Sequence, residues 1–349
     1  MANPLEPDLD RLAEADVPPW EALRSARLLL TGGTGFFGGW LLETLLHAED
    51  RLALGVQVEV VTRDPAAFRQ ARPHLANHRA VRLLAGDVVT LEPAGGSYTH
   101  VIHAATPASA RLNVEQPRIM FETIVEGTRR VLEVGRQGGA RRFLLASSGA
   151  VYGRQPPDLS HLPEDYPGAP GPGAPGSAYG EGKRAAEALC ARYASEGWLE
   201  PVVARGFAFA GPYLPLDSHF AIGNFVRDAI RGGPIRVTGD GTTFRSYLYG
   251  ADLAIWLWTL LVRGQSGRAY NVGSERAISI GELAGMVARE LGIGTCVEIA
   301  EAPVPGRAAA RYVPSTRRAR EELGLRETVT VEQSIRRMAE FARRTVPEP

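Results

Sequence analysis

A glycine-rich segment directly after a short apolar run constrains this chain most. Residues 31–39 read Thr-Gly-Gly-Thr-Gly-Phe-Phe-Gly-Gly, follow the apolar run 28–30 and precede a stretch, 40–47, with helical apolar spacing. Glycines spaced in this way permit a tight turn and a close approach of the backbone to a bound pyrophosphate, and the helix that follows points free N–H groups at it. The context therefore predicts a dinucleotide-binding turn. Its expected cofactor contacts are Gly32, Gly35, Phe36, Phe37 and Gly38.

Strand-like and helix-like stretches alternate through the first part of the chain. Short apolar or β-branched runs occur at 27–30, 56–62, 81–84, 101–103, 143–146 and 201–204, and the clearest helical patterns are 118–137 and 180–196. This alternation predicts an α/β fold, a Rossmann-type doubly wound parallel sheet with helices on both faces. The rhythm loosens after about residue 210, which favours a smaller C-terminal substrate lobe.

We expect three regions on this basis. Residues 1–26 form an N-terminal extension, 27–205 are mainly the dinucleotide-binding domain, and 206–349 are mainly the substrate lobe, with some elements returning to the main domain. The stretch 155–176 is rich in Pro and Gly and predicts a loop. Because it ends just before Tyr179, it is either a functional loop or a plain spacer.

Composition excludes several classes of protein. Basic and acidic residues number 39 each, so no strong field favours nucleic acid or an anionic membrane as a partner. Cys190 and Cys296 have no metal-ligand or CxxC spacing, which favours a reduced cytoplasmic setting and no metal site. The acidic N-terminus does not resemble a signal peptide, and the most apolar segment, 253–262, is too short to cross a bilayer.

The end of the second strand-like run bears on the choice between NAD and NADP. NAD enzymes usually place a carboxylate there to hold the ribose 2′-hydroxyl. Here Thr62 takes that place and Arg63 follows, which favours NADP because an arginine can pair with a 2′-phosphate. A register shifted by one or two residues would instead put Asp64 at the tip and favour NAD.

Two further segments complete a recognisable set. Residues 145–153 read Leu-Ala-Ser-Ser-Gly-Ala-Val-Tyr-Gly, and 179–183 read Tyr-Gly-Glu-Gly-Lys. In this order after the glycine turn, they resemble the extended short-chain dehydrogenase/reductase family, specifically its nucleotide-sugar epimerase/dehydratase branch. The resemblance covers roughly residues 27–325. It implies an NAD(P) cofactor and a nucleotide-linked sugar as the substrate.

The spacing of the proposed catalytic residues fits this chemistry. Tyr179 and Lys183 are four residues apart on a predicted helix and so share one face. The ammonium of Lys183 is expected to lower the pKa of the phenol, so that Tyr179 can accept a sugar hydroxyl proton. Ser148 leaves the end of a strand and can hydrogen-bond the same sugar oxygen. The resemblance also implies that Lys183 reaches the nicotinamide ribose.

The resemblance implies further binding residues. We expect cofactor contacts from Asp87, Val88, Ala104 and Ala105, and substrate contacts from Ser148, Asn224, Arg245 and Arg311. Arginine suits a diphosphate through its planar set of donors. Two departures from the family pattern, Ala208 and Ile124, stand where asparagine is usual.

The reaction depends on the residues before Val-Tyr-Gly. Dehydratases of this family carry an acidic or Ser-Glu pair there, and decarboxylases often carry a glutamate, whereas this chain has Gly149 and Ala150. Neither can transfer a proton. The sequence therefore favours a C4 epimerase or 4-ketoreductase that needs only a hydride and one proton. A 4,6-dehydratase or decarboxylase stays the alternative, and a non-catalytic NADP-sensing protein is an alternative of another class. We expect a homodimer.

Overall fold

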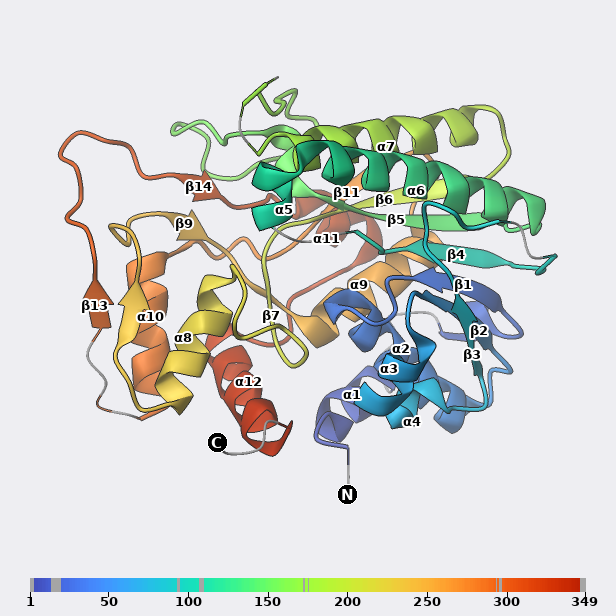
Figure 1. Cartoon of the computed structure of the whole chain (residues 1–349), viewed down its shortest axis with the longest axis horizontal. Helices are drawn as coiled ribbons and strands as arrows, with labels where there is room; N and C mark the ends of the chain where they lie inside the picture. The colour runs from blue at the N-terminus through green and yellow to red at the C-terminus, as the bar shows by residue number, and fades with distance from the viewer. Residues whose placement is uncertain are drawn as a thin grey trace.

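The computed structural model describes most of the chain (Figure 1). The described residues are 3–13, 20–92, 95–106, 110–171, 173–174, 176–292, 294 and 297–345. Cys296 and part of the expected N-terminal extension lie outside them.

A parallel sheet forms the centre of the molecule. Its strands are β1 (Arg27–Thr31), β2 (Gln57–Thr62), β3 (Val81–Ala85), β4 (His100–His103), β5 (Arg142–Ser148), β6 (Glu200–Gly206) and β11 (Ala269–Val272). Within the described ranges they pair, always in parallel, as one seven-stranded sheet in the order β11-β6-β5-β4-β1-β2-β3. The order reverses between β1 and β4, where ligands of such sheets bind. The predicted Rossmann-type fold is confirmed.

Helices cover both faces of the sheet, as Figure 1 shows. α2 (Phe36–Leu52) packs with α9 (Gly250–Arg263) on one face, and α6 (Pro117–Gln137) packs with α7 (Ala178–Ser195) on the other. β1 shows why both faces need a cover. Leu28 and Leu30 join the core of α2 and α9, whereas Leu29 joins the core of α6 and α7. Successive strand side chains point to opposite faces, so a strand covered on both sides is apolar throughout.

Shorter elements complete this half. They are α3 (Pro65–Ala71), α4 (Pro73–Ala76), α5 (Ala110–Glu115) and the 3-10 turn η2 (Gly149–Tyr152). The Pro/Gly-rich stretch is anchored where it is described. Leu162 is buried and forms a bridge with Pro314, and a Glu164 carboxylate oxygen accepts a hydrogen bond of 3.0 Å from the backbone of Asn271 on β11.

The C-terminal half forms a second core. There α8 (Ala221–Ile230), α10 (Ile280–Glu290) and α12 (Val331–Thr345) pack beside the parallel pair β8 (Ile235–Val237) and β13 (Val297–Ile299). The other elements are β7 (Phe209–Ala210), β9 (Phe244–Arg245), β10 (Leu248–Tyr249), β12 (Ile278–Ser279), β14 (Arg311–Tyr312) and α11 (Arg317–Leu323). β11 and α9 belong to the main sheet and its cover. The domain boundaries expected from the sequence stay a prediction.

The described part of the N-terminal region packs on the main domain. It contains α1 (Glu6–Ala13) and the 3-10 turn η1 (Trp20–Leu23). Leu5, Leu9 and Leu12 are buried in the core that α2 and α9 share. The Tyr249 hydroxyl also donates a hydrogen bond of 2.7 Å to Asp8. Within the described residues, no helix combines the length and the apolar character needed to cross a membrane.

Candidate active site

The glycine turn is so tightly packed that two of its positions have no room for a side chain. Gly32 has φ +76°, and a Cβ atom there would lie 2.5 Å from the Ala104 carbonyl carbon. A Cβ atom on Gly38 would lie 2.3 Å from the carbonyl oxygen of Gly32. α2 begins at Phe36, and its N-cap residue Gly35 provides no side-chain acceptor for the first N–H groups. These groups are therefore available to an anion, so the turn fits a dinucleotide pyrophosphate.

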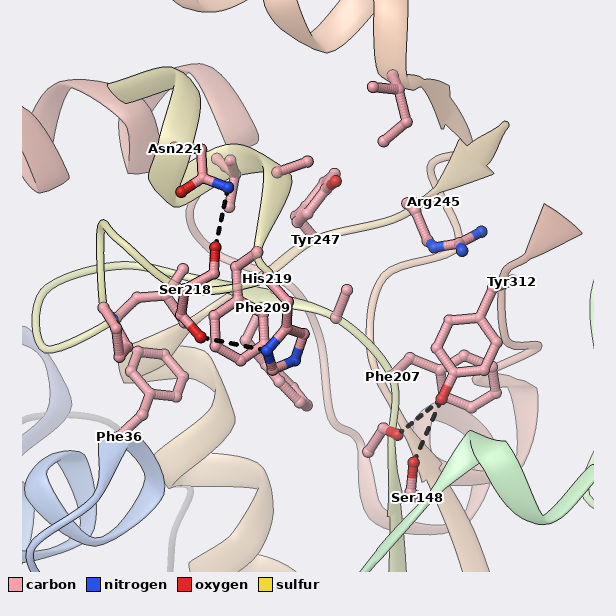
Figure 2. A pocket seen from close by; sticks show the side chains of 18 of the residues that line it. Phe36, Ser148, Phe207, Phe209, Ser218, His219, Asn224, Arg245, Tyr247 and Tyr312 are labelled. Carbon is pink, nitrogen blue, oxygen red and sulfur yellow. Dashed lines mark hydrogen bonds between the residues drawn. The ribbon is translucent and has the colours of Figure 1, made fainter. Parts of the chain in front are cut away.

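A cavity of about 870 Å³ opens beside this turn. It lies between the carboxyl ends of the central strands and the C-terminal lobe, and Figure 2 shows part of its wall. Its lining includes the predicted residues Gly32, Gly35, Phe36, Phe37, Ala104, Ser148, Tyr179, Lys183, Asn224 and Arg245. Side chains far apart in the sequence thus share one chamber, which is the usual form of a small-molecule site.

Lys183 is held firmly beneath this chamber. Its side chain is buried, and its ammonium donates hydrogen bonds of 2.7 Å to the Thr106 hydroxyl and 2.6 Å to the Ala146 carbonyl. Tyr179 lies one turn earlier on α7, and its backbone N–H donates a hydrogen bond of 2.9 Å to the side chain of Asn113. The predicted common face is present, since the Lys183 nitrogen lies 5.9 Å from the centre of the Tyr179 ring.

The electrostatics of this pair differ from the expectation. Burial lowers the pKa of Lys183 to about 8, although the nearby Glu187 carboxylate acts in the opposite direction. Burial also raises the pKa of Tyr179, and a hydrogen bond with Ser148 offsets part of that rise. The Lys183 ammonium donates its hydrogen bonds to Thr106 and Ala146, and the pKa of the phenol is raised where the sequence led us to expect it lowered.

A partly buried ion pair that the sequence did not suggest lies beside Ser147. Glu187, one turn after Lys183, accepts hydrogen bonds of 2.5 Å from the Ser147 hydroxyl and 2.7 Å from Arg205. Arg205 also donates a hydrogen bond of 2.9 Å to the Tyr152 hydroxyl. Such partners offset the loss of hydration that a charged group suffers when it is partly buried. The network fixes the end of β5 and the α7 face that carries Lys183.

Tyr312 is the main site residue that the sequence did not indicate. Its hydroxyl lies 3.4 Å from the Ser148 hydroxyl, and its ring packs 4.6 Å from that of Phe207, as Figure 2 shows. Arg311, which was predicted instead, does not line the cavity and stacks on Phe244 at 4.3 Å. Neighbouring residues of a strand point in opposite directions, so β14 can turn only one of this pair toward the site.

Two predicted substrate residues line the cavity. Asn224 on α8 donates a hydrogen bond of 2.9 Å to the Ser218 carbonyl (Figure 2). Arg245 on β9 lies over the Tyr312 ring at 5.5 Å, and burial lowers its pKa. Within the described residues, no carboxylate lies within salt-bridge distance of Arg245. A partly buried guanidinium without a carboxylate partner is suited to an anionic ligand.

The peripheral cofactor candidates lie outside the lining of this cavity. They are Gly38, Arg63, Asp87, Val88 and Ala105. Arg63 is exposed directly after β2, whereas Asp64 caps α3 by accepting a hydrogen bond of 2.9 Å from the Ala67 backbone. Asp87 similarly accepts a hydrogen bond of 2.9 Å from the backbone of Val89. The roles of these residues stay predictions.

The position of Gly149 is sterically closed. A Cβ atom there would lie 2.7 Å from both the Tyr312 hydroxyl and the Phe207 ring. Gly149 and Ala150 form the start of η2, directly after Ser148. The wall beside Ser148 therefore carries a phenol and a phenyl ring where an acidic side chain at residue 149 would have to pass.

Comparison with known proteins places this geometry in a family. Residues 28–273 match the NAD dependent epimerase/dehydratase family. UDP-glucuronic acid decarboxylase 1 of Xenopus tropicalis is 30% identical over 341 residues, which are 97% of this chain and 77% of that protein. The structure of MoeE5 in complex with UDP-glucuronic acid and NAD is similar with a TM-score of 0.75 at 27% identity, over 92% of this chain and 100% of that one.

A further solved structure supports the fold. DesIV, a dTDP-glucose 4,6-dehydratase from Streptomyces venezuelae whose structure contains NAD, has a TM-score of 0.78 at 24% identity, over 91% of this chain and 97% of that one. The glycine turn, the Ser148–Tyr179–Lys183 set and the family match cover the same part of the chain. The chain belongs to the NAD dependent epimerase/dehydratase family.

Proposed function

We propose that this protein oxidises C4 of a nucleotide-linked hexuronic acid of the UDP-glucuronic acid type and that the oxidised sugar then loses CO2. The observation that carries the proposal is the Ser148–Tyr179–Lys183 set in a chamber of about 870 Å³, in a chain whose relatives are UDP-glucuronic acid decarboxylases. These relatives favour the decarboxylase or dehydratase alternative over the C4 epimerase or ketoreductase that the sequence favoured, and the MoeE5 structure contains UDP-glucuronic acid and NAD.

The chemistry of CO2 loss makes few demands on the protein. NAD⁺, when bound, would accept the hydride from C4 and return it to C4 after CO2 has left, so that the product is a UDP-pentose and the cofactor is regenerated. Tyr179 accepts the proton of the C4 hydroxyl, and Ser148 holds the same oxygen. The product is a β-keto acid, whose C5–C6 bond breaks with the electron pair delocalised onto the C4 oxygen. This step requires no base at C5.

Gly149 and Ala150 therefore separate the two alternatives. Loss of water from a 4-keto sugar requires a base at C5 and an acid at the C6 hydroxyl, and neither residue can serve. Loss of CO2 requires neither group at that step. Among the reactions that the relatives suggest, decarboxylation suits this wall better than dehydration.

Recognition of the substrate would come from the C-terminal lobe. We assign the partly buried Arg245 to an anionic group of the substrate and Asn224 to its polar contacts, because both line the chamber. The cofactor would occupy the glycine turn, which lines the chamber at the point where α2 begins. The preference for NADP suggested by Arg63 remains a prediction.

The experiment is a substrate panel. The purified protein is incubated with NAD⁺ or NADP⁺ and, in separate reactions, with UDP-glucuronic acid, UDP-glucose and dTDP-glucose, and the products are separated and weighed by mass spectrometry. We expect conversion of UDP-glucuronic acid to a UDP-pentose with release of CO2. Formation of a 4-keto-6-deoxy sugar from either hexose would contradict the proposal and restore the dehydratase.

C4 epimerisation is the second candidate, because Gly149 and Ala150 also leave a site suited to hydride transfer alone. It predicts a product of unchanged mass from UDP-glucuronic acid or UDP-glucose, with C4 inverted and no CO2. The same panel therefore separates the two candidates.

We also propose that the protein forms a homodimer. Val114 on α5 and Ile119 and Phe121 on α6 are large apolar side chains with exposed fractions of 62%, 49% and 39%. Such residues close together on one surface often mark an interface. Sedimentation of the wild type and of Ile119→Glu tests this: we expect a dimer that the substitution weakens, and a monomeric wild type would exclude it.

A further inference from the structure

Ser148 links two tyrosines rather than one. Its hydroxyl lies close enough to Tyr179, the predicted acid–base, to lower the pKa of that phenol. The same hydroxyl lies 3.4 Å from that of Tyr312, so three hydroxyl groups follow one another at the floor of the chamber. Figure 2 shows the contact between Ser148 and Tyr312.

Tyr312 is held in this place by several elements. β14 pairs with β9, which brings the residue across from the C-terminal lobe. Its hydroxyl donates a bond of 3.4 Å to the Gly206 carbonyl at the end of β6, and its ring lies between Phe207 and Arg245. A side chain fixed on three sides presents its hydroxyl at one point of the chamber wall.

That point is next to the reacting carbons. If Ser148 holds the C4 oxygen, a group 3.4 Å from Ser148 is within reach of C4 and its neighbours. The proposed reaction needs one carbon-bound proton, at C5, to replace the lost carboxylate. Tyr179 and Tyr312 both line the chamber and both interact with Ser148, and we have assigned Tyr179 to the C4 oxygen.

We propose that Tyr312 donates the proton to C5 after CO2 has left, an inference that rests on the decarboxylation proposed above. The C5–C6 bond breaks, CO2 departs, and the electron pair forms the C4–C5 enolate. The O–H bond of Tyr312 then breaks as the C5–H bond forms and the C4 carbonyl is restored. The tyrosinate regains a proton through Ser148, and one proton taken from water in each turnover balances the loss of the carboxylate as CO2.

The state of Tyr312 agrees with this role. Burial raises its pKa, and the hydrogen bond with Ser148 and the charge of Arg245 offset only part of that rise. The phenol is therefore protonated at neutral pH, which a proton donor requires.

The test follows deuterium in the product. Wild type, Tyr312→Phe and the control Tyr166→Phe, whose ring packs on Tyr152 away from the chamber, are incubated in deuterated water with NAD⁺ and UDP-glucuronic acid. NMR of the UDP-pentose shows which of the two C5 positions carries deuterium. We expect wild type and Tyr166→Phe to label one position. Tyr312→Phe should form product at least about tenfold more slowly and label both positions, because the solvent then protonates the enolate.

The outcomes separate the two claims. If Tyr312→Phe labels one position at the wild-type rate, Tyr312 is not the donor, while the decarboxylase function stands. If the wild type releases no CO2, the proposed function fails and the role of Tyr312 fails with it. Tyr312→His keeps a proton donor in a ring and should retain labelling at one position. Labelling of both positions by Tyr312→His, with single labelling by Tyr312→Phe, would also overturn the proposal.

Discussion

Tyr179 and Ser148 are the residues on which proton transfer at the C4 oxygen depends. Tyr179→Phe removes one hydroxyl from a buried ring that lines the chamber. We expect the fold and cofactor binding to persist and kcat to fall at least about a hundredfold, since an acid–base contributes about that factor or more. Tyr193→Phe, on the same helix but bonded to Glu133, is the matched control for steady-state assays. A Tyr179→Phe enzyme with kcat near that of the control would exclude this role.

Lys183 makes the stability of the cofactor-free protein depend on pH. Burial lowers its pKa from 10.5 to about 8 in the folded chain, so between these values the unfolded chain binds more protons. Stability should therefore rise with pH across this window, by up to about 1.4 kcal/mol per pH unit from this group alone. Urea unfolding at several pH values should show a steeper rise in wild type than in Lys183→Met. Equal slopes would mean that the buried amine keeps its ordinary pKa.

At the scale of elements, the turn between β1 and α2 carries the cofactor. A methyl group on Gly38 would meet the Gly32 carbonyl at 2.3 Å, which is backbone and cannot move aside without opening the turn. We expect Gly38→Ala to weaken NAD binding in calorimetry by at least about tenfold, or about 1.4 kcal/mol. Gly285→Ala on α10, where the nearest atom is the flexible Arg289 side chain at 3.4 Å, is the control. Unchanged affinity in Gly38→Ala would show that the turn does not bind the cofactor.

The junction between β2 and α3 bears on cofactor choice. Asp64 is engaged as the N-cap of α3, so its carboxylate is committed to the Ala67 backbone, while Arg63 is exposed beside it. Arg63→Ala should therefore weaken NADP more than NAD, because a 2′-phosphate loses its cation. Titration of both cofactors against both proteins measures this. Equal losses for NAD and NADP would show that Arg63 does not contact the 2′-phosphate.

For the whole molecule, the sequence predicted the strands and helices that local patterns of apolar residues indicate. The expected runs 27–30, 81–84 and 143–146 fall inside β1, β3 and β5, and the helix expected at 118–137 is observed as α6. Periodicity and glycine spacing act over a few residues, so they are readable without a structure. The contact of Tyr312 with Ser148 joins residues 164 positions apart, and only the folded chain brings them together. Likewise, nothing in the local pattern around Arg205 pairs it with Glu187.

The same limit applies to the reaction. From the sequence, Gly149 and Ala150 favour a reaction that needs only a hydride and one proton over dehydration or decarboxylation, because neither residue can transfer a proton. The Tyr312 hydroxyl lies 2.7 Å from the place that a Cβ atom on Gly149 would take, and it comes from a strand of the other lobe. A side chain contributed from so far along the chain cannot be inferred from the motif around Gly149, whereas similarity over 97% of the chain to a UDP-glucuronic acid decarboxylase points to the reaction.

The most direct test of the central claim is to follow the carboxylate carbon of UDP-glucuronic acid. The substrate carries an isotopic label at that carbon, and labelled CO2 is collected from reactions of wild type and Tyr179→Phe with NAD⁺. The account predicts that wild type releases the label as CO2 while a UDP-pentose forms in equal amount, and that Tyr179→Phe releases almost none. Retention of the label in a C4-inverted sugar, or no turnover of any nucleotide sugar by the wild type, would contradict it.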